Sequence, residues 1–79
     1  MEWMDAKQLI EEIAEGQRKK LLACAERIVP HVTSEDLLQP NDFPELENHP
    51  VFRYEEGALE GILTVYTALL AQQSEVSEL

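Results

Sequence analysis

Several residue types are scarce in this chain of 79 residues, and each shortage excludes a class of protein. Cys24 is the only cysteine, so no disulfide can form within the chain, which fits a reducing compartment. No apolar run approaches the roughly 18 residues of a membrane span, and the amino terminus is acidic where a secretory signal would be basic. We therefore expect a soluble, cytoplasmic protein that has no membrane partner.

Basic residues are also scarce. The chain has 6 Lys and Arg against 16 Asp and Glu, a net charge of −10, and no Lys or Arg lies between residues 30 and 51. Such a surface repels a phosphate backbone, so we expect no nucleic-acid partner. The short basic run Arg18-Lys19-Lys20 is then interpreted as a solvated helix face.

The residue types that bind metals or transfer protons are present without the spacing of a site. They are Cys24, His31, Asp36, Asp42, Glu45 and His49. Structural zinc needs closely spaced Cys and His pairs, and di-metal helix bundles need Glu-x-x-His on a core helix. We therefore expect no catalytic residue, no cofactor and no metal, and Cys24 as a buried thiol. The rival hypothesis is a small metal-binding protein or enzyme that uses the His, Asp and Glu residues around residues 30–51.

All four prolines lie within one stretch, between Val29 and Gly57, and both long helical patterns stop at its edges. The pattern predicts a single domain with a helix over about 5–29, a connector over about 30–51, a helix over about 52–73 and a frayed tail over 74–79. The connector region carries too many large apolar residues for a solvated linker, which predicts that it packs on the helices. These residues are Val32, Leu37, Leu38, Phe43, Leu46, Val51 and Phe52.

Local signals predict where the helices begin. Asp5 with Gln8 has the spacing of a capping box, with Met4 and Leu9 at the positions of a hydrophobic staple. Thr33 can cap the Asp36 amide at the start of a short turn that ends at Pro40, and a second short turn follows over 41–46. The sequence thus predicts an all-α, antiparallel two-helix hairpin whose connector contains one or two short helical turns.

Charge favours the antiparallel arrangement, because it places the basic residues of 18–27 beside the acidic start of the second helix. The apolar stripe of that second helix is wider than one partner helix covers. This width predicts a homodimer, in which two hairpins form a four-helix bundle through Leu59, Ile62, Tyr66 and Leu69. Trp3, ahead of the first cap, is a candidate anchor for a protein partner.

Two features leave alternatives open. Gly57 and Gly61 have a small-xxx-small spacing, which indicates either a close helix crossing in water or a connector that packs near Gly57. Gln17, a polar residue in the apolar stripe of the first helix, either sets the register of an interface or points outward. Phe43, Phe52 and Tyr66 are expected in the core.

The runs Asp36-Leu37-Leu38-Gln39-Pro40-Asn41-Asp42-Phe43-Pro44-Glu45-Leu46-Glu47 and Phe52-Arg53-Tyr54-Glu55-Glu56-Gly57 resemble the signature block of small bacterial helical-hairpin proteins with no assigned activity. The resemblance covers about a third of the chain and implies no catalytic residues. The sequence as a whole therefore predicts a small acidic protein-interaction module that acts through helix–helix association and is not an enzyme.

Overall fold

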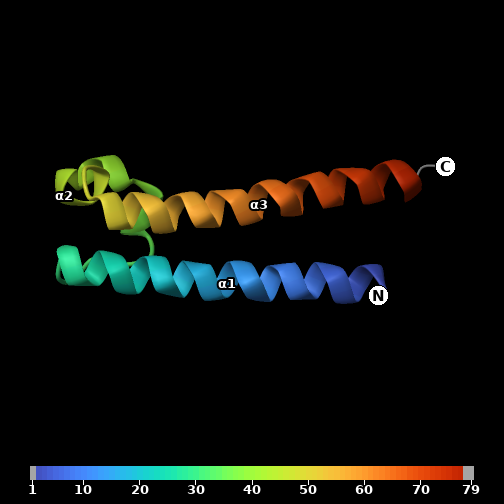
Figure 1. The fold of residues 1–79 in the computed structure, drawn as a ribbon, viewed down its shortest axis with the longest axis horizontal. Helices are drawn as coiled ribbons and strands as arrows, with labels where there is room; N and C mark the ends of the chain where they lie inside the picture. Colours follow the sequence, from blue (N-terminus) through green and yellow to red (C-terminus); the bar gives the residue numbers. More distant parts are fainter. Residues whose placement is uncertain (1, 78–79) are drawn as a thin grey trace.

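Two long antiparallel helices, joined by a folded connector at one end, form the structure (Figure 1). It is a computed structural model that describes residues 2–77, with the side chains of residues 2–40 and 42–74. The elements are α1 (Trp3–Ile28), η1 (Asp36–Leu38), η2 (Pro40–Asp42), α2 (Pro44–Glu47) and α3 (Pro50–Ser77), of which η1 and η2 are short 3₁₀ helices. The predicted all-α hairpin with a structured connector is confirmed. α3 continues through Ser77, past the predicted end at Gln73, and residues 78–79 of the expected tail lie outside the described part.

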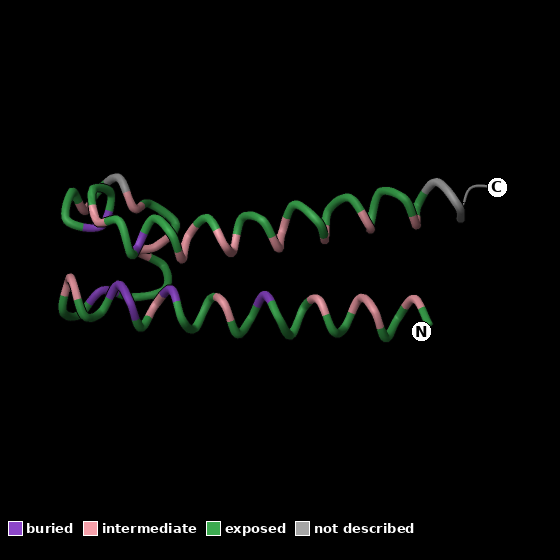
Figure 2. Tube along the Cα trace, viewed as in Figure 1, coloured by how far each residue is buried: buried purple, intermediate pink, exposed green. Residues whose placement is uncertain are grey.

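The hairpin is long and thin. It measures 48 × 20 × 19 Å and has a radius of gyration of 15.3 Å, whereas a compact chain of this length has about 12 Å. Buried residues gather near the connector, with Ala14 the last of them along the hairpin (Figure 2). In the open half, over residues 2–13 and 53–74, no described residue is buried. None of the described helices combines the length and the apolar character needed to cross a membrane.

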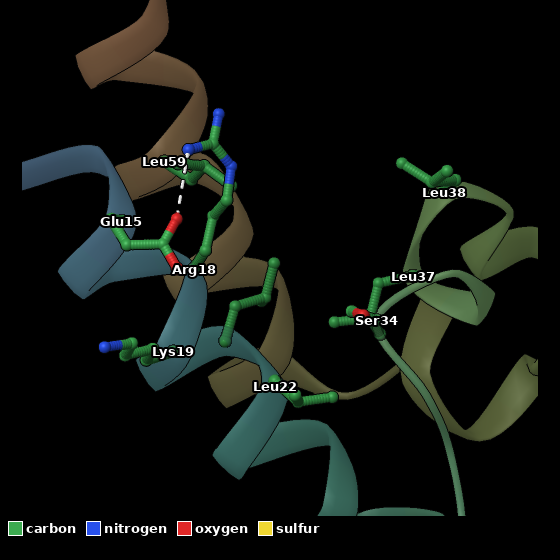
Figure 3. Close-up of a pocket in the computed structure, with 9 residues that line it drawn as sticks. Glu15, Arg18, Lys19, Leu22, Ser34, Leu37, Leu38 and Leu59 are labelled. Carbon is green, nitrogen blue, oxygen red and sulfur yellow. Dashed lines mark ion pairs between the residues drawn. The ribbon is translucent and has the colours of Figure 1, made fainter. Parts of the chain in front are cut away.

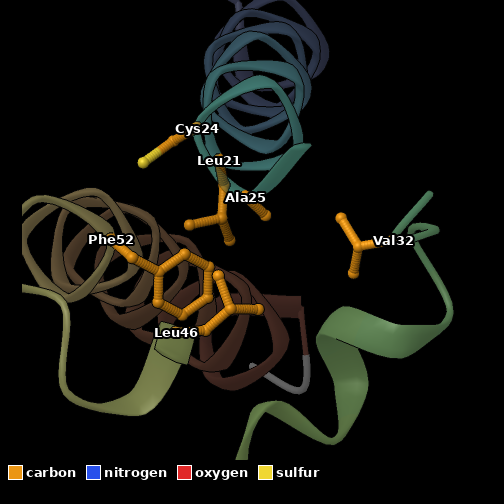
Figure 4. Close-up of a cluster of buried hydrophobic side chains, with 6 residues drawn as sticks. All are labelled: Leu21, Cys24, Ala25, Val32, Leu46 and Phe52. Atoms are coloured by element: carbon orange, nitrogen blue, oxygen red, sulfur yellow. The ribbon is translucent and has the colours of Figure 1, made fainter. Parts of the chain in front are cut away.

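The core forms where the connector docks on the two helices (Figure 4). Its buried members are Leu21, Cys24, Ala25, Val32, Leu46 and Phe52, and Leu37 and Phe43 pack against it while partly exposed. The predicted docking is therefore confirmed for most of the connector. It is wrong for Leu38 and Val51, which are 78% and 51% exposed. Leu38 belongs to a 3₁₀ turn, in which consecutive side chains point in different directions, so Leu37 faces the core and Leu38 does not.

The amino-terminal cap differs from the prediction. α1 begins at Trp3 after Glu2, whose side chain makes no capping hydrogen bond, so Asp5 lies inside the first turn. Gln8 donates to Glu12 at 3.3 Å instead of reaching back, and both members of the predicted staple, Met4 and Leu9, are exposed. The capping box is wrong because Trp3 and Met4 are compatible with helix and extend it, while Asp5 still suits the positive end of the helix dipole.

The chain leaves α1 through a tight turn. Val32 N donates to Val29 O at 3.3 Å, and His31 has a φ of 71°. Pro30 at the second position and a positive φ at the third are typical of a type II turn. The predicted cap that follows is confirmed, since Asp36 N donates to Thr33 Oγ1 at 3.3 Å. Thr33 N also donates to Asp36 Oδ2 at 2.9 Å.

The docked connector leads to a matched pair of substitutions. Leu46→Ala empties a fully buried site and should lower the free energy of unfolding by about 2 to 5 kcal/mol. Leu38→Ala makes the same chemical change in the same segment at an exposed site, and should stay within about 0.5 kcal/mol. Urea denaturation of both variants measures the difference. Equal, small effects would show that the connector is not docked.

Candidate functional site

Gln17 joins the two long helices. Its Nε2 donates to the backbone oxygen of Glu55 at 3.0 Å and to the Oε2 of the same residue at 2.6 Å. Gln17 is therefore an interface residue, the first of its two sequence alternatives, and the interface is the one between α1 and α3. A directional bond at this position fixes how far one helix slides along the other.

A second polar contact joins the helices nearer their open end. Tyr66 Oη donates to Glu11 Oε2 at 2.5 Å, and Lys7 Nζ lies 2.9 Å from the same oxygen. The hydrogen bond from Tyr66, and then that from Lys7, lowers the pKa of the Glu11 carboxyl below its ordinary value. The same carboxylate raises the pKa of Tyr66 and the pKa of Lys7. Tyr66 is half-buried, so it is a bridge at the helix contact and not the expected core residue.

Ion pairs do not link the two helices in the described part of the chain. The pairs present are Lys7–Glu11, Arg18–Glu15 and Arg53–Glu56, each within one helix. The antiparallel orientation is as predicted, but the expected pairing of residues 18–27 with Glu55, Glu56 and Glu60 is not formed as direct contacts. Short-range spacing explains this, since neighbours one turn away on the same helix are easier to reach than a second helix.

One side of α3 carries no charge between Pro50 and Ser74. With about 3.6 residues per turn, its neutral residues cover an arc of about 140°, and every charged side chain between Pro50 and Ser74 lies outside it. We call this arc the uncharged face: Val51, Tyr54, Gly57, Ala58, Gly61, Ile62, Val65, Ala68, Leu69 and Gln72. Tyr54 is 73% exposed and Val65 is 56% exposed. The face therefore presents apolar groups to solvent along most of the helix.

The two glycines of this face are exposed, and a Cβ added at Gly57 or Gly61 would meet nothing within 4 Å. Neither glycine marks a close approach within the chain, so the helix crossing between α1 and α3 does not use them. The connector does not pack near Gly57 either. Their lack of side chains leaves the uncharged face shallow at its centre.

α1 extends this surface with two exposed apolar residues, Leu9 at 45% and Ile13 at 49%. Leu9 and Ile13 lie about two turns and one turn before Gln17, on the same side of α1. Ile62 and Val65 lie about two and three turns after Glu55, on the same side of α3. Because Gln17 and Glu55 are bonded to each other, these two sets of residues lie on the same side of the hairpin. Leu9 and Ile13 thus border the uncharged face.

The predicted interaction residues are partly covered within the single chain. Leu59, Ile62, Tyr66 and Leu69 are all half-buried, as is Trp3 in the first turn of α1. Leu59 packs against the core and Tyr66 bonds to Glu11, so both are engaged within the chain. Ile62 and Leu69 lie at the edge where the helix contact meets the uncharged face.

The candidate metal ligands differ in their surroundings. His31, Asp42 and Glu45 are exposed, His49 is half-buried, and Asp36 bonds to Thr33. Cys24 is buried at 2% exposure within the core, as expected. Among the residues that the structure describes, no group of three or more His, Cys, Asp and Glu side chains comes together to hold a metal ion.

A cavity of about 430 Å³ lies between α1, the connector and α3. Figure 3 shows Leu22 of α1 turned toward it, Ser34, Leu37 and Leu38 across from α1, and Leu59 behind. Glu15, Arg18 and Lys19 also line it, and the amino group of Lys19 points away from Leu37 and Leu38. Nothing in the sequence indicated this cavity. The solvated basic run is exposed as expected, yet Arg18 and Lys19 also form the rim. No local signal reveals which side of α1 the folded connector approaches.

The bridge from Tyr66 to Glu11 predicts a stability that depends on pH. Tyr66→Phe removes the donor, so wild type should unfold at higher urea concentration near neutral pH. The pKa of Glu11 is lowered on folding, so this advantage is present above pH 4.5 and is lost as pH falls through the pKa of Glu11 in the folded state. The pKa of Tyr66 is raised on folding, so the advantage is also present below pH 10.0 and is lost as pH rises through the pKa of Tyr66 in the folded state.

Tyr54→Phe is the matched control, because the Tyr54 side chain is exposed and makes no hydrogen bond within the described residues. Urea midpoints of both variants and wild type, measured across this pH range, provide the comparison. If Tyr66→Phe and Tyr54→Phe have the same effect at neutral pH, the bridge does not contribute to stability.

Comparisons with protein-family models, with curated proteins and with solved structures found no match to this chain. What the molecule can do therefore follows from its own two surfaces. One is an exposed, uncharged helix face, and the other is a leucine-lined cavity with a basic rim.

Proposed function

We propose that this protein is a protein-interaction module that associates through its helices, and that its first partner is a second copy of itself. The uncharged face of α3 is the observation that carries the proposal. Exposed apolar patches bordered by polar residues are typical of protein–protein contacts. Two hairpins joined through this face would form a four-helix bundle, the arrangement that the width of the apolar stripe favours.

The amount of exposed surface supports a second copy as the occupant. The chain exposes 5785 Å², whereas a compact protein of its mass exposes about 4,850 Å². The excess of roughly 900 Å² is close to the roughly 800 Å² that each partner contributes to a standard interface. This area would be covered in the open half of the hairpin, where none of the residues 2–13 and 53–74 is buried.

The distribution of charge favours self-association over association with a basic partner. The chain has a net charge of −10, yet its charges are absent from the uncharged face. In a two-fold interface the residues at the axis meet their own copies, so a charge there would face a like charge, and an uncharged face avoids this repulsion. Gly57 and Gly61, with open space around them, would let the two α3 backbones approach closely.

The role of Ile62 and Leu69 follows from their position. Both are half-buried in the single chain, so the partner's helices would complete their burial and extend the hairpin's core into its open half. Leu9 and Ile13 of α1 would join them at the border of the contact. The dimer would thereby supply the stability that a domain of this size rarely gains alone.

Sedimentation equilibrium tests the proposal. Wild type should sediment as a dimer at micromolar concentration, and higher salt should tighten association by screening the remaining negative charge. Val65→Glu places a carboxylate in the uncharged face at an exposed position, so it should shift the protein to monomer by at least about tenfold in Kd, equivalent to about 1.4 kcal/mol.

Met4→Glu is the matched control, since Met4 is 66% exposed and lies on the opposite side of α1 from Leu9 and Ile13, which border the uncharged face. It adds the same charge and should leave the dimer intact. A wild-type chain that is monomeric and cooperatively folded at both low and high salt would overturn the proposal. Equal weakening by the two variants would place the contact elsewhere.

A further inference from the structure

The cavity beside α1 lies away from the uncharged face. The buried residues Ala14 and Leu21 mark the side of α1 that faces α3. Arg18 and Leu22 lie to one side of them, and Leu9 and Ile13 lie to the other. A second copy bound to the uncharged face would therefore leave this cavity open. A ligand bound in this cavity would therefore not depend on dimerisation.

Leucine side chains form most of the cavity wall. They are Leu21, Leu22, Leu37, Leu38 and Leu59. Ser34, Glu15, Arg18 and Lys19 provide the polar part of the lining. Leu38 is 78% exposed, the largest exposure among the large apolar residues that the structure describes. The wall can therefore accept aliphatic groups, and the polar selection of a ligand must take place at the rim.

The rim is basic in a strongly acidic protein. Glu15 Oε2 lies 3.7 Å from Arg18 Nη1, longer than a charge-assisted hydrogen bond, and both side chains are about half exposed. Arg18 and Lys19 make no other ion pair within the described part of the chain. The donors of Arg18 are available to an outside carboxylate, and those of Lys19 become available at the cavity when its exposed side chain turns toward the rim. The net charge of −10 would discourage acidic partners elsewhere on the surface.

We propose that this cavity binds a short acidic segment of a partner protein, with leucine-like side chains entering between α1 and η1 and carboxylates pairing with Arg18 and Lys19. The volume falls within the range of binding pockets. The α1 residues of the wall run from Glu15 to Leu22, about 10 Å along the axis, which matches two turns of an amphipathic helix. An alkyl carboxylate is a less suitable ligand, because its chain would be covered best in a closed tunnel, whereas the rim residues Arg18, Lys19 and Leu38 are exposed here.

A synthetic peptide tests the proposal by fluorescence anisotropy. The probe is a fluorescein-labelled helix of leucine and glutamate, with leucines at i, i+3, i+4 and i+7. Wild type should bind it saturably with a micromolar Kd that weakens as salt rises. A version with lysine in place of every glutamate should bind at least tenfold more weakly, as should a scrambled version that keeps the composition and has no apolar side.

Neighbouring substitutions separate the cavity from general electrostatics. Lys19→Glu should weaken binding at least tenfold, whereas Lys20→Glu makes the same charge change one residue away, outside the wall, and should change the Kd less than twofold. Leu38→Ser should also weaken binding tenfold, and it should leave the fold intact because Leu38 is exposed. Leu70→Ser changes another exposed leucine and should not weaken binding. Circular dichroism confirms folding, and repetition in Val65→Glu excludes an effect of self-association.

Three results would overturn the proposal. The first is the absence of saturable binding of the acidic peptide up to about 1 mM. The second is an equal effect of Lys19→Glu and Lys20→Glu, which would show attraction by net charge without a site. The third is binding of dodecanoate, below its micelle concentration, that displaces the peptide and is lost in Leu38→Ser, which would assign the cavity to an alkyl chain.

Discussion

The docking of the connector on the two helices is the contact on which the rest of the structure depends. Leu46 and Phe52 are fully buried there, against Leu21 and Ala25 of α1. This core aligns α1 and α3 and determines which side chains meet farther along. Gln17 can reach Glu55, and Tyr66 can reach Glu11, only because the helices leave the core at a fixed spacing.

The balance of apolar and polar contacts changes along the hairpin. Near the connector the helices are held by buried side chains and by the bridge from Gln17 to Glu55. Beyond Ala14 they are held by half-buried side chains and by the bridge from Tyr66 to Glu11. Both proposed surfaces follow from this gradient. The uncharged face extends into the half that lacks a core, and the basic cavity lies where the connector leaves the side of α1 incompletely filled.

The sequence predicted the hairpin because its strongest signals are local. Four prolines interrupt any continuous helix, Thr33 and Asp36 cap each other, and apolar residues recur at helical spacing on either side. The contact of Gln17 with Glu55 and the exposure of Leu38 were not predictable in the same way. They depend on the rotation of one element about another, which spacing within a single element does not determine. The lack of charge on one face of α3 was readable from the sequence, but it becomes meaningful only once that face is known to be exposed.

Because the core holds the two helices together at the connector end, a small change in their angle there is amplified toward the open end. The molecule is 48 Å long and its core occupies one end. A change of about 5° in the angle between α1 and α3 at the core moves the far end of the 28-residue α3 by about 3 to 4 Å, because the helix rises about 1.5 Å per residue. The cavity that contains Leu37 and Leu59 lies beside this clamped end. Small adjustments of packing at the base are thus converted into large displacements at the tips.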